Sequence, residues 1–198
     1  MRFPLLAAAG LSALAAAGAV AQTHGGHAGH AGHDAQAGHA GHAPETAMPA
    51  PRGAFAQADL RTADGRPVGR ATAVRVGTSI RVNLAVHDLP RGTHGAHVHM
   101  VGRCEAPDFA SAGGHWNPAA RQHGLNSRRG AHAGDMPNLV VGANNRGSLS
   151  FTLRGGTPAG LLDTDGAAFV VHADADDQRT DPSGNSGGRI ACGVFTRI

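Results

Sequence analysis

From Arg52 to the C-terminus the chain consists of short runs in which large apolar residues recur at every second position, and this pattern most constrains its fold. In the clearest run Ile80, Val82, Leu84 and Val86 are each separated by one residue. Because successive side chains of a β-strand point to opposite faces, this run predicts a strand with one buried face. Turn residues separate the runs, and 30 glycines among 198 residues favour turns over long helices.

Eight runs of this kind follow one another, and no convincing helix lies between them. They span Ala54–Leu60, Val68–Val76, Ile80–Val86, His94–Val101, Leu139–Gly142, Ser148–Arg154, Ala167–His172 and Arg189–Thr196. The pattern predicts an all-β domain over residues 52–198, an eight-stranded antiparallel Greek-key sandwich or barrel. Two long irregular stretches remain, Gly102–Pro137 and Ala173–Gly188, and loops of this length in a compact domain are usually functional.

The first 21 residues have the layout of a secretory signal. Arg2 precedes an apolar stretch, which ends in the small-residue cleavage pattern Ala19-Val20-Ala21. We expect residues 1–21 to be removed as a signal peptide, leaving a periplasmic or secreted chain that starts at Gln22. A retained membrane anchor is the alternative, and it fits less well because the stretch is rich in Ala and Gly.

Residues 22–51 form a low-complexity extension of His, Ala, Gly and Pro. This composition cannot bury a core, so we expect disorder in the absence of a ligand. Imidazoles on a flexible chain can wrap around Cu(II), Ni(II) or Zn(II), although nothing fixes the geometry that would select one of them. A solvated linker is the alternative interpretation. The histidines expected to capture metal ions are His24, His27, His30, His33, His39 and His42.

The positive charge of the chain does not indicate a nucleic-acid partner. All 17 basic residues are arginines, no three of them are adjacent, and 14 acidic residues oppose them. A dedicated nucleic-acid surface needs clustered cations, so we expect none here.

Histidines also gather in the expected β domain. The candidate ligands there are His97, His99, His115, His123, His132, Asp135 and His172. The first two lie two apart on an expected strand, so their side chains leave the same face. Taken singly, a histidine is more often a surface residue, as we expect for His87. Seven nitrogen and oxygen donors in one domain predict metal ligation instead.

Six motifs carry a resemblance to a known family. They are Gly95-Ala96-His97-Val98-His99, Gly114-His115-Trp116-Asn117-Pro118, His123-Gly124, Ala131-His132-Ala133-Gly134-Asp135, Val170-Val171-His172 and Gly188-Arg189-Ile190-Ala191-Cys192-Gly193-Val194. In these motifs the chain from Arg52 to Ile198 resembles copper/zinc superoxide dismutase, a family with a β-sandwich architecture.

The resemblance implies one copper and one zinc ion per subunit. Copper would be held by His97, His99, His115 and His172. Zinc would be held by His115, His123, His132 and Asp135, so that His115 bridges the two ions. Asp176 matches the family's carboxylate that hydrogen-bonds ligand histidines of both metals, and the alternative for it is an ordinary loop aspartate.

The activity implied by the resemblance is conversion of superoxide to dioxygen and hydrogen peroxide by Cu(II)/Cu(I) cycling, which in an exported protein would protect the cell envelope. His115 would carry a proton, and Arg189 would attract the anion beside the copper ion. For steering over longer distances we expect Arg128 and Arg129 to supply the positive field, unless both are merely solvated. His94 and Trp116 are less decisive, and the tryptophan could equally be core packing.

Cys104 and Cys192 fit a single disulfide in an exported protein. The resemblance implies that this bridge ties the first long loop to the last strand. Two free thiols acting as copper ligands are the alternative, which the export signal disfavours.

A second function stays open: a copper-binding or metal-buffering protein in which the histidine-rich extension dominates. Resemblance of fold does not separate the two functions. Arg189 favours the enzyme, because a scaffold kept only for metal binding does not need it. Both a monomer and a homodimer are compatible with the sequence.

Overall fold

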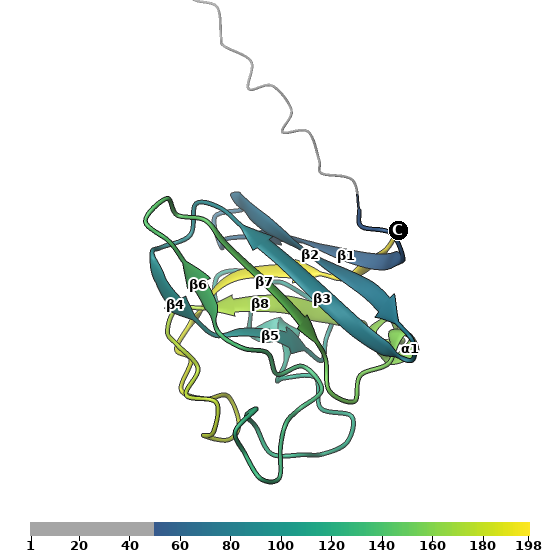
Figure 1. Cartoon of the computed structure of the whole chain (residues 1–198). Coiled ribbons are helices and arrows are strands. Elements are labelled where there is room, and N and C mark those ends of the chain that lie inside the picture. The colour runs from purple at the N-terminus through teal and green to yellow at the C-terminus, as the bar shows by residue number, and fades with distance from the viewer. Residues whose placement is uncertain (1–49) are drawn as a thin grey trace, which may run out of the picture. The chain divides into compact units, whose positions relative to one another are not determined.

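The alternating runs form the strands of one antiparallel sheet in the computed structural model, which describes residues 50–198 (Figure 1). The strands are β1 (Ala54–Arg61), β2 (Pro67–Val76), β3 (Ser79–Val86), β4 (Gly92–His94), β5 (Ala96–His99), β6 (Leu139–Val141), β7 (Gly147–Thr152), β8 (Ala168–His172), β9 (Arg189–Val194) and β10 (Thr196–Arg197). Helical structure in the described part is confined to the 3-10 turn η1 (Ala110–Ala112) and the four-residue helix α1 (Pro158–Leu161).

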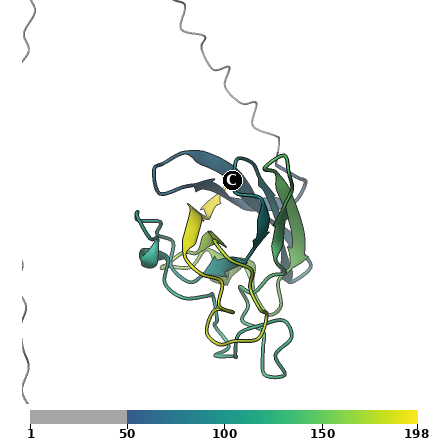
Figure 2. The ribbon, with the colours of Figure 1, turned by 90° about the vertical axis from the view of Figure 1, so that its left-hand side faces the viewer.

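The sheet curls into a nearly closed barrel, which is seen end-on in Figure 2. Its strand order is β4-β6-β7-β3-β2-β1-β9-β8-β5, with β10 paired to β1. The two strands at the ends of this order, β4 and β5, are consecutive in the chain and are separated only by Gly95. The two edges of the sheet therefore meet at Gly95, which leaves little of either edge exposed.

The predicted all-β class is confirmed, and the strand count differs from eight at two places. The run His94–Val101 is divided because Gly95 leaves the ladder: its N–H donates to Asp174 O and its carbonyl accepts from His172 N. The run Arg189–Thr196 is divided at Phe195: β9 lies between β8 and the end of β1, whereas β10 pairs with β1 near its start, at Ala56 and Gln57. Alternation alone gives no signal for either event.

The barrel interior holds the core. Ile80, Val82, Leu84 and Val86, the residues of the clearest alternating run, are all buried there. Across the interior, β8 contributes Phe169, which is also fully buried. Burial of such side chains, at about 25 cal/mol per Å² of apolar surface, is the main stabilising contribution to the barrel.

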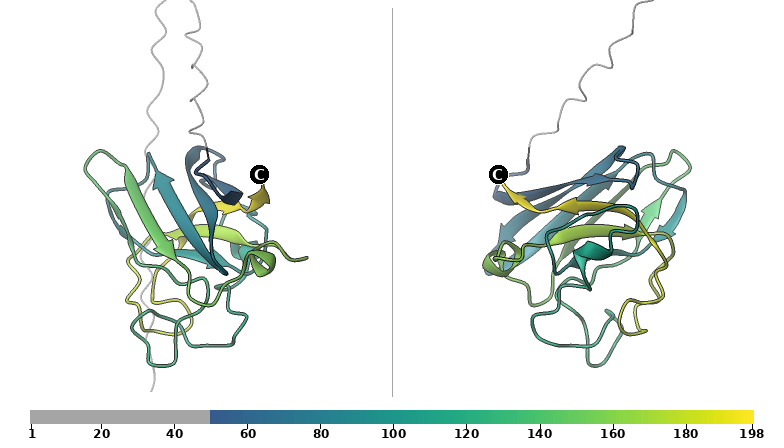
Figure 3. Two further views of the ribbon diagram at one scale, coloured as in Figure 1. Left: turned by 45° about the vertical axis from the view of Figure 1, so that its right-hand side comes forward. Right: turned by 180° about the vertical axis from the view of Figure 1, so that it is seen from behind.

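Both long loops lie on the same side of the barrel, as Figures 1 and 3 show. They touch through the backbone: Asn126 N donates to Gln178 O at 3.2 Å. Gly124 allows this approach, since its φ is +104° and a Cβ there would overlap with Gln178 O. The two loops therefore form one unit.

Residues 1–49 lie outside the described residues, and with them the expected signal peptide and nearly all of the histidine-rich extension. Among residues 50–198, no helix is long and apolar enough to cross a membrane.

Candidate metal centre

The centre is built around β5, whose four residues are all buried. Pairing of β5 with β8 brings His97 and His99 close to His172 at the end of β8. On its other side β5 is flanked by two short loop segments, through the isolated bridges His99↔His115 and His97↔Asp135. Backbone hydrogen bonds from the strand thus position loop residues that carry no periodic pattern of their own.

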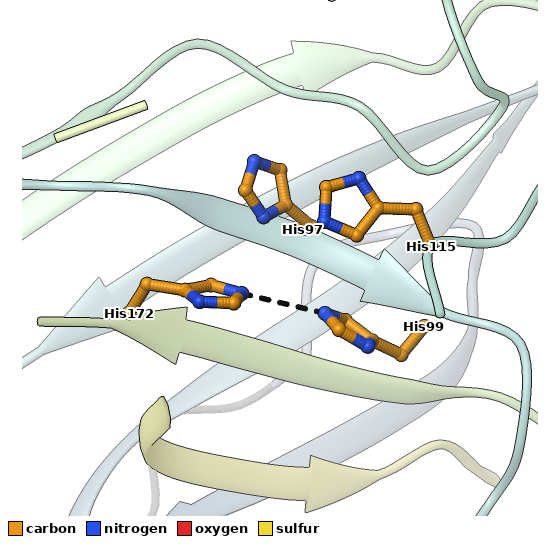
Figure 4. Close-up of side chains that lie close together, drawn as sticks. All are labelled: His97, His99, His115 and His172. Atoms are coloured by element: carbon orange, nitrogen blue, oxygen red, sulfur yellow. Dashed lines mark hydrogen bonds between the residues drawn. The ribbon is translucent and has the colours of Figure 1, made fainter. Parts of the chain in front are cut away.

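Four imidazoles, those of His97, His99, His115 and His172, form the first group, called here the four-histidine group (Figure 4). One ligand atom of each lies within 4.8 Å of the others. The Nε2 atoms of His172 and His99 point at each other at 3.4 Å, and the His97 and His115 ring centres are 4.0 Å apart.

A second group, called here the Asp135 group, shares His115 with the first and adds His123, His132 and Asp135. Asp135 Oδ1 lies 2.9 Å from Nδ1 of His115, 3.0 Å from Nδ1 of His123 and 3.3 Å from Nδ1 of His132. Asp135 Oδ2 points away and accepts hydrogen bonds from the backbone N–H groups of Gly124 and His132. Three imidazole nitrogens and one carboxylate oxygen thus converge, which is a donor set suited to a tetrahedral zinc ion.

The remaining ring nitrogens of these histidines face acceptors outside the two groups. The two oxygens of Asp176 lie 2.7 Å from His97 Nε2 and 3.0 Å from His123 Nε2. Backbone carbonyls face two other rings: Gly113 O lies 2.9 Å from His99 Nδ1, and Gly187 O lies 3.3 Å from His172 Nδ1. Asp181 Oδ1 lies 3.6 Å from His132 Nε2. Protons held on these outer nitrogens leave the inner nitrogens with free lone pairs. Only His115 has no such acceptor, and its two nitrogens point one into each group.

Buried nitrogen atoms that lack hydrogen-bond partners also indicate that each group can hold a metal ion. In the described residues, four buried side-chain polar atoms have no hydrogen-bond partner, and three of them are inner imidazole nitrogens: His97 Nδ1, His115 Nε2 and His132 Nδ1. A buried polar atom without a partner costs about 1 to 3 kcal/mol. Their convergence shows that the site is shaped for a ligand that accepts nitrogen lone pairs.

The electrostatics of the two groups differ. Burial lowers the pKa of His97 to about 3 and of His172 to about 4, so these rings are held neutral, as metal ligation requires. Burial also acts on His123, but hydrogen bonds to Asp135 and Asp176 outweigh it and raise the pKa of His123 to about 9. The Asp135 group therefore attracts positive charge, and a bound cation would displace a proton.

A cavity of about 480 Å³ opens over the four-histidine group, and Arg189 lines it together with His99, His115 and His172. The Arg189 guanidinium donates to Phe109 O at 2.5 Å and to Gly113 O at 2.7 Å. Burial lowers the pKa of Arg189, but an arginine remains charged at any working pH. A fixed cation thus stands beside the imidazoles in a pocket sized for small solutes.

Cys104 and Cys192 form a disulfide, as predicted, with a Cα–Cα distance of 5.7 Å. It links the first long loop to β9 close to Arg189. Behind it, the loop residues Phe109 and Ala112 form a small apolar cluster with Ala168 and Val170 of β8 and Cys192 of β9. The bridge therefore supports the two carbonyls that hold the guanidinium.

Three other residues near the site carry no sequence motif that would single them out. Asn138 exchanges two hydrogen bonds with the backbone of Asp176, at 2.8 and 2.9 Å. Asp181 accepts from His123 N at 2.6 Å and lies close to His132. Gly184 has a φ of +65° and covers Asp176 so closely that a Cβ there would overlap with its carboxylate.

None of His94, Trp116 and His87 belongs to the two donor groups. His94 is buried, with its ring nitrogens 2.9 Å from the carbonyl oxygens of Pro90 and His172. Trp116 directly follows His115 and packs against Gly156 and Gly160 as part of the core. His87 belongs to neither group and pairs with Asp88 at 2.9 Å.

The β-barrel and its two interlocked loops hold two adjacent donor groups that share one imidazole. This arrangement defines a protein that can hold two metal ions side by side. Residues 67–195 match the sequence profile of copper/zinc superoxide dismutase. The chain belongs to the copper/zinc superoxide dismutase family, and it is accordingly an oxidoreductase that uses copper and zinc.

Relatives and solved structures agree with this membership. A copper/zinc superoxide dismutase of Aquifex aeolicus is 38% identical over 145 residues, covering 69% of this chain and 85% of that protein. A superoxide dismutase-like protein of Bacillus subtilis is 47% identical over 120 residues, covering 58% of this chain and 61% of that protein. The crystal structure of a SOD-like protein from Bacillus subtilis superposes with a TM-score of 0.64 at 39% identity, covering 70% of this chain and 96% of that one.

Proposed function

We propose that the protein dismutes superoxide at the four-histidine group. His97, His99, His115 and His172 would hold copper, and His115, His123, His132 and Asp135 would hold zinc. Copper, when bound, supplies one-electron chemistry by alternating between Cu(II) and Cu(I). The observation that carries the proposal is Arg189, whose charge is held beside the four imidazoles in a cavity that admits small solutes.

Three residues of the site have different roles in this reaction. The Arg189 guanidinium attracts superoxide and orients it in the cavity, at a place where the charge is little screened. His115 lines the cavity and can hold a proton at Nε2, a buried atom without a hydrogen-bond partner among the described residues. Asp135 keeps Nδ1 of His115 on the zinc side, so that Nε2 remains the atom that exchanges the proton.

The test is the second-order rate of superoxide decay after a radiolysis pulse, measured on mature protein loaded with both metals. A rate near the diffusion ceiling of about 10⁹ M⁻¹s⁻¹ is expected. A rate no higher than that of a chelated-copper control would mean that the protein binds these metals without turnover and would favour the metal-buffering function.

We further propose Arg121 as the main steering cation. All three of Arg121, Arg128 and Arg129 are exposed, but of these only Arg121 lines the cavity. Asn117 fixes the backbone of Arg121 at the cavity wall by donating to its carbonyl at 2.7 Å and accepting from its N–H at 2.9 Å. Arg121 is therefore the loop arginine best placed to draw an anion inward.

Replacing Arg121 by Gln should lower the rate on the order of threefold at low ionic strength and flatten its salt dependence. The reason is that 0.1 M salt screens the attraction of an exposed charge at distances beyond about 10 Å. The double replacement of Arg128 and Arg129 by Gln is the matched comparison and should have the smaller effect. If the double variant alone flattens the salt dependence, those two residues supply the field.

Export and protection of the cell envelope are also part of the proposal. They are supported by the signal-like residues 1–21 and by the disulfide, which persists in oxidising compartments. The extension of residues 22–51 would capture metal ions through its six histidines and raise their concentration near the domain.

Deletion of residues 22–51 should slow reconstitution when copper or zinc is limiting and leave the rate of the fully loaded protein unchanged. The measurement compares activity against time after adding substoichiometric metal to both forms. A deletion variant that is slower even at full loading would mean that the extension acts on catalysis rather than on metal capture.

A further inference from the structure

Met100 places a thioether at the mouth of the cavity over the four-histidine group. It directly follows His99, at the bend where β5 ends, and it lines the cavity together with His99, His115 and His172. The residue is 51% exposed, so a solute that arrives from solvent can reach its side chain.

Packing does not explain this placement. Among the described residues, the exposed large apolar side chains are Val76, Met100, Val140 and Ile198. Single exposed apolar residues are ordinary, but of these four only Met100 lines the cavity. The other methionine in the described part, Met136, is fully buried, as a flexible apolar side chain normally is.

The chemistry of the cavity mouth gives Met100 a distinct property. The other polar residues there, Asn117, Arg121, Asp181 and Ser183, offer hard oxygen donors or repel cations. A thioether is a soft ligand that prefers Cu(I) to the harder Cu(II) ion. The mouth thus contains one group that distinguishes the reduced copper ion from the oxidised one.

The position of the sulfur also suits the transfer of a copper ion to the four-histidine group. A Cβ on Gly113 would lie 3.8 Å from Met100 Sδ, so the thioether lies against that glycine. The Gly113 carbonyl accepts from His99 Nδ1 and thereby directs His99 Nε2 inward. His115 also lines the cavity, and its buried Nε2 has no hydrogen-bond partner among the described residues.

We propose that Met100 is a transient Cu(I) ligand through which copper reaches the four-histidine group. The thioether binds Cu(I) at the cavity mouth, and His99 and His172 then replace it as ligands. No electron is transferred in this step, since only the bonds from ligand to copper change. The inference rests on the copper site of the proposed function, and it adds a site of uptake that selects the oxidation state.

The test follows copper uptake by the mature, zinc-loaded, copper-free protein under anaerobic conditions. Cu(I) is supplied as its bicinchoninate complex, whose colour is lost on transfer, and Cu(II) is supplied separately as the aqua ion. Met100→Leu should slow Cu(I) uptake about tenfold, equal to about 1.4 kcal/mol in the barrier, and leave Cu(II) uptake unchanged. Met136→Leu removes a buried thioether of the same kind and should match the wild type in both assays.

Equal slowing of Cu(I) and Cu(II) would overturn the proposal, because it would show a change in the shape of the mouth rather than the loss of a soft ligand. Unchanged Cu(I) uptake would overturn it as well. A second measurement traps the step: in His172→Ala with substoichiometric Cu(I), X-ray absorption should show a sulfur ligand that disappears on adding Met100→Leu. Only nitrogen ligands would contradict the proposal. Because both assays follow copper and not superoxide, their outcome is independent of whether the loaded protein is active.

Discussion

Replacement of Asp176 by Asn is expected to weaken the binding of both metals, each by about 10- to 100-fold. This buried carboxylate accepts from His97 Nε2 at 2.7 Å through one oxygen and from His123 Nε2 at 3.0 Å through the other. It thus fixes one ligand in each donor group. Asparagine has nearly the same shape, but its NH₂ group would face an imidazole N–H, so one of the two rings must turn or change tautomer.

The charge of Asp176 strengthens this expectation. Burial would raise the pKa of its carboxyl, but hydrogen bonds from His123 and His97 hold that pKa well below its usual range. The carboxylate is therefore ionised when it contacts the rings, and its bonds to them are charge-assisted. Loss of a partner leaves the other groups buried without compensation, which is the costly outcome for such networks.

The measurement is a chelator competition for copper and for zinc, each with the other site filled. Asp177→Asn is the matched control, because Asp177 is exposed and bonds to Arg179 N, Thr180 N and Asn185 rather than to a histidine. Gly184→Ala should reproduce the loss by steric means, since its Cβ would overlap with the Asp176 carboxylate. A loss confined to zinc would show that backbone pairing of β5 is enough to orient His97.

The features that the sequence predicts well are those with a local signal. The alternation over 80–86 identifies β3 because burial on one face imposes a period of two on adjacent residues. The seven donors stand in motifs that resemble a family, and the structure gathers all seven in two groups that share His115. In both cases the signal lies within short segments of the chain: one alternating run in the first case and the individual motifs in the second.

The features that could not be predicted depend on contacts between distant loops. Four aspartates between positions 174 and 181 look alike in composition, and the family resemblance alone singled out Asp176. The structure shows that Asp176 is the buried one and that Asn138, 38 residues away, holds its backbone. The conspicuous positive feature in the sequence is the Arg128-Arg129 pair, and whether that pair or Arg121 steers superoxide stays a prediction. Arg121 reaches the cavity because its backbone is held by Asn117, which is a property of loop conformation and not of composition.

Removal of the disulfide is the change expected to cost the most stability. The bridge closes a loop of 88 residues, and the chain-entropy relation gives roughly 4 to 5 kcal/mol for a loop of that length. Native domains are stable by about 5 to 15 kcal/mol, so a variant with both cysteines replaced by Ala should lose a large part of its free energy of unfolding. Urea unfolding of metal-free protein measures this directly, because bound metals would add their own stabilisation.

The same variant should also lose activity at full metal loading, for a reason separate from stability. Cys104 anchors the loop whose Phe109 and Gly113 carbonyls hold the Arg189 guanidinium, and Gly113 O also orients His99. With the anchor gone, Arg189 samples more positions, so the rate of superoxide decay should fall by more than copper affinity does. The wild type treated with a reductant should show the same two losses, whereas the variant should not respond to the reductant. If stability falls while the rate of the fully loaded protein is unchanged, the packing of Phe109 against Val170 is enough to position the guanidinium, and the bridge serves stability alone.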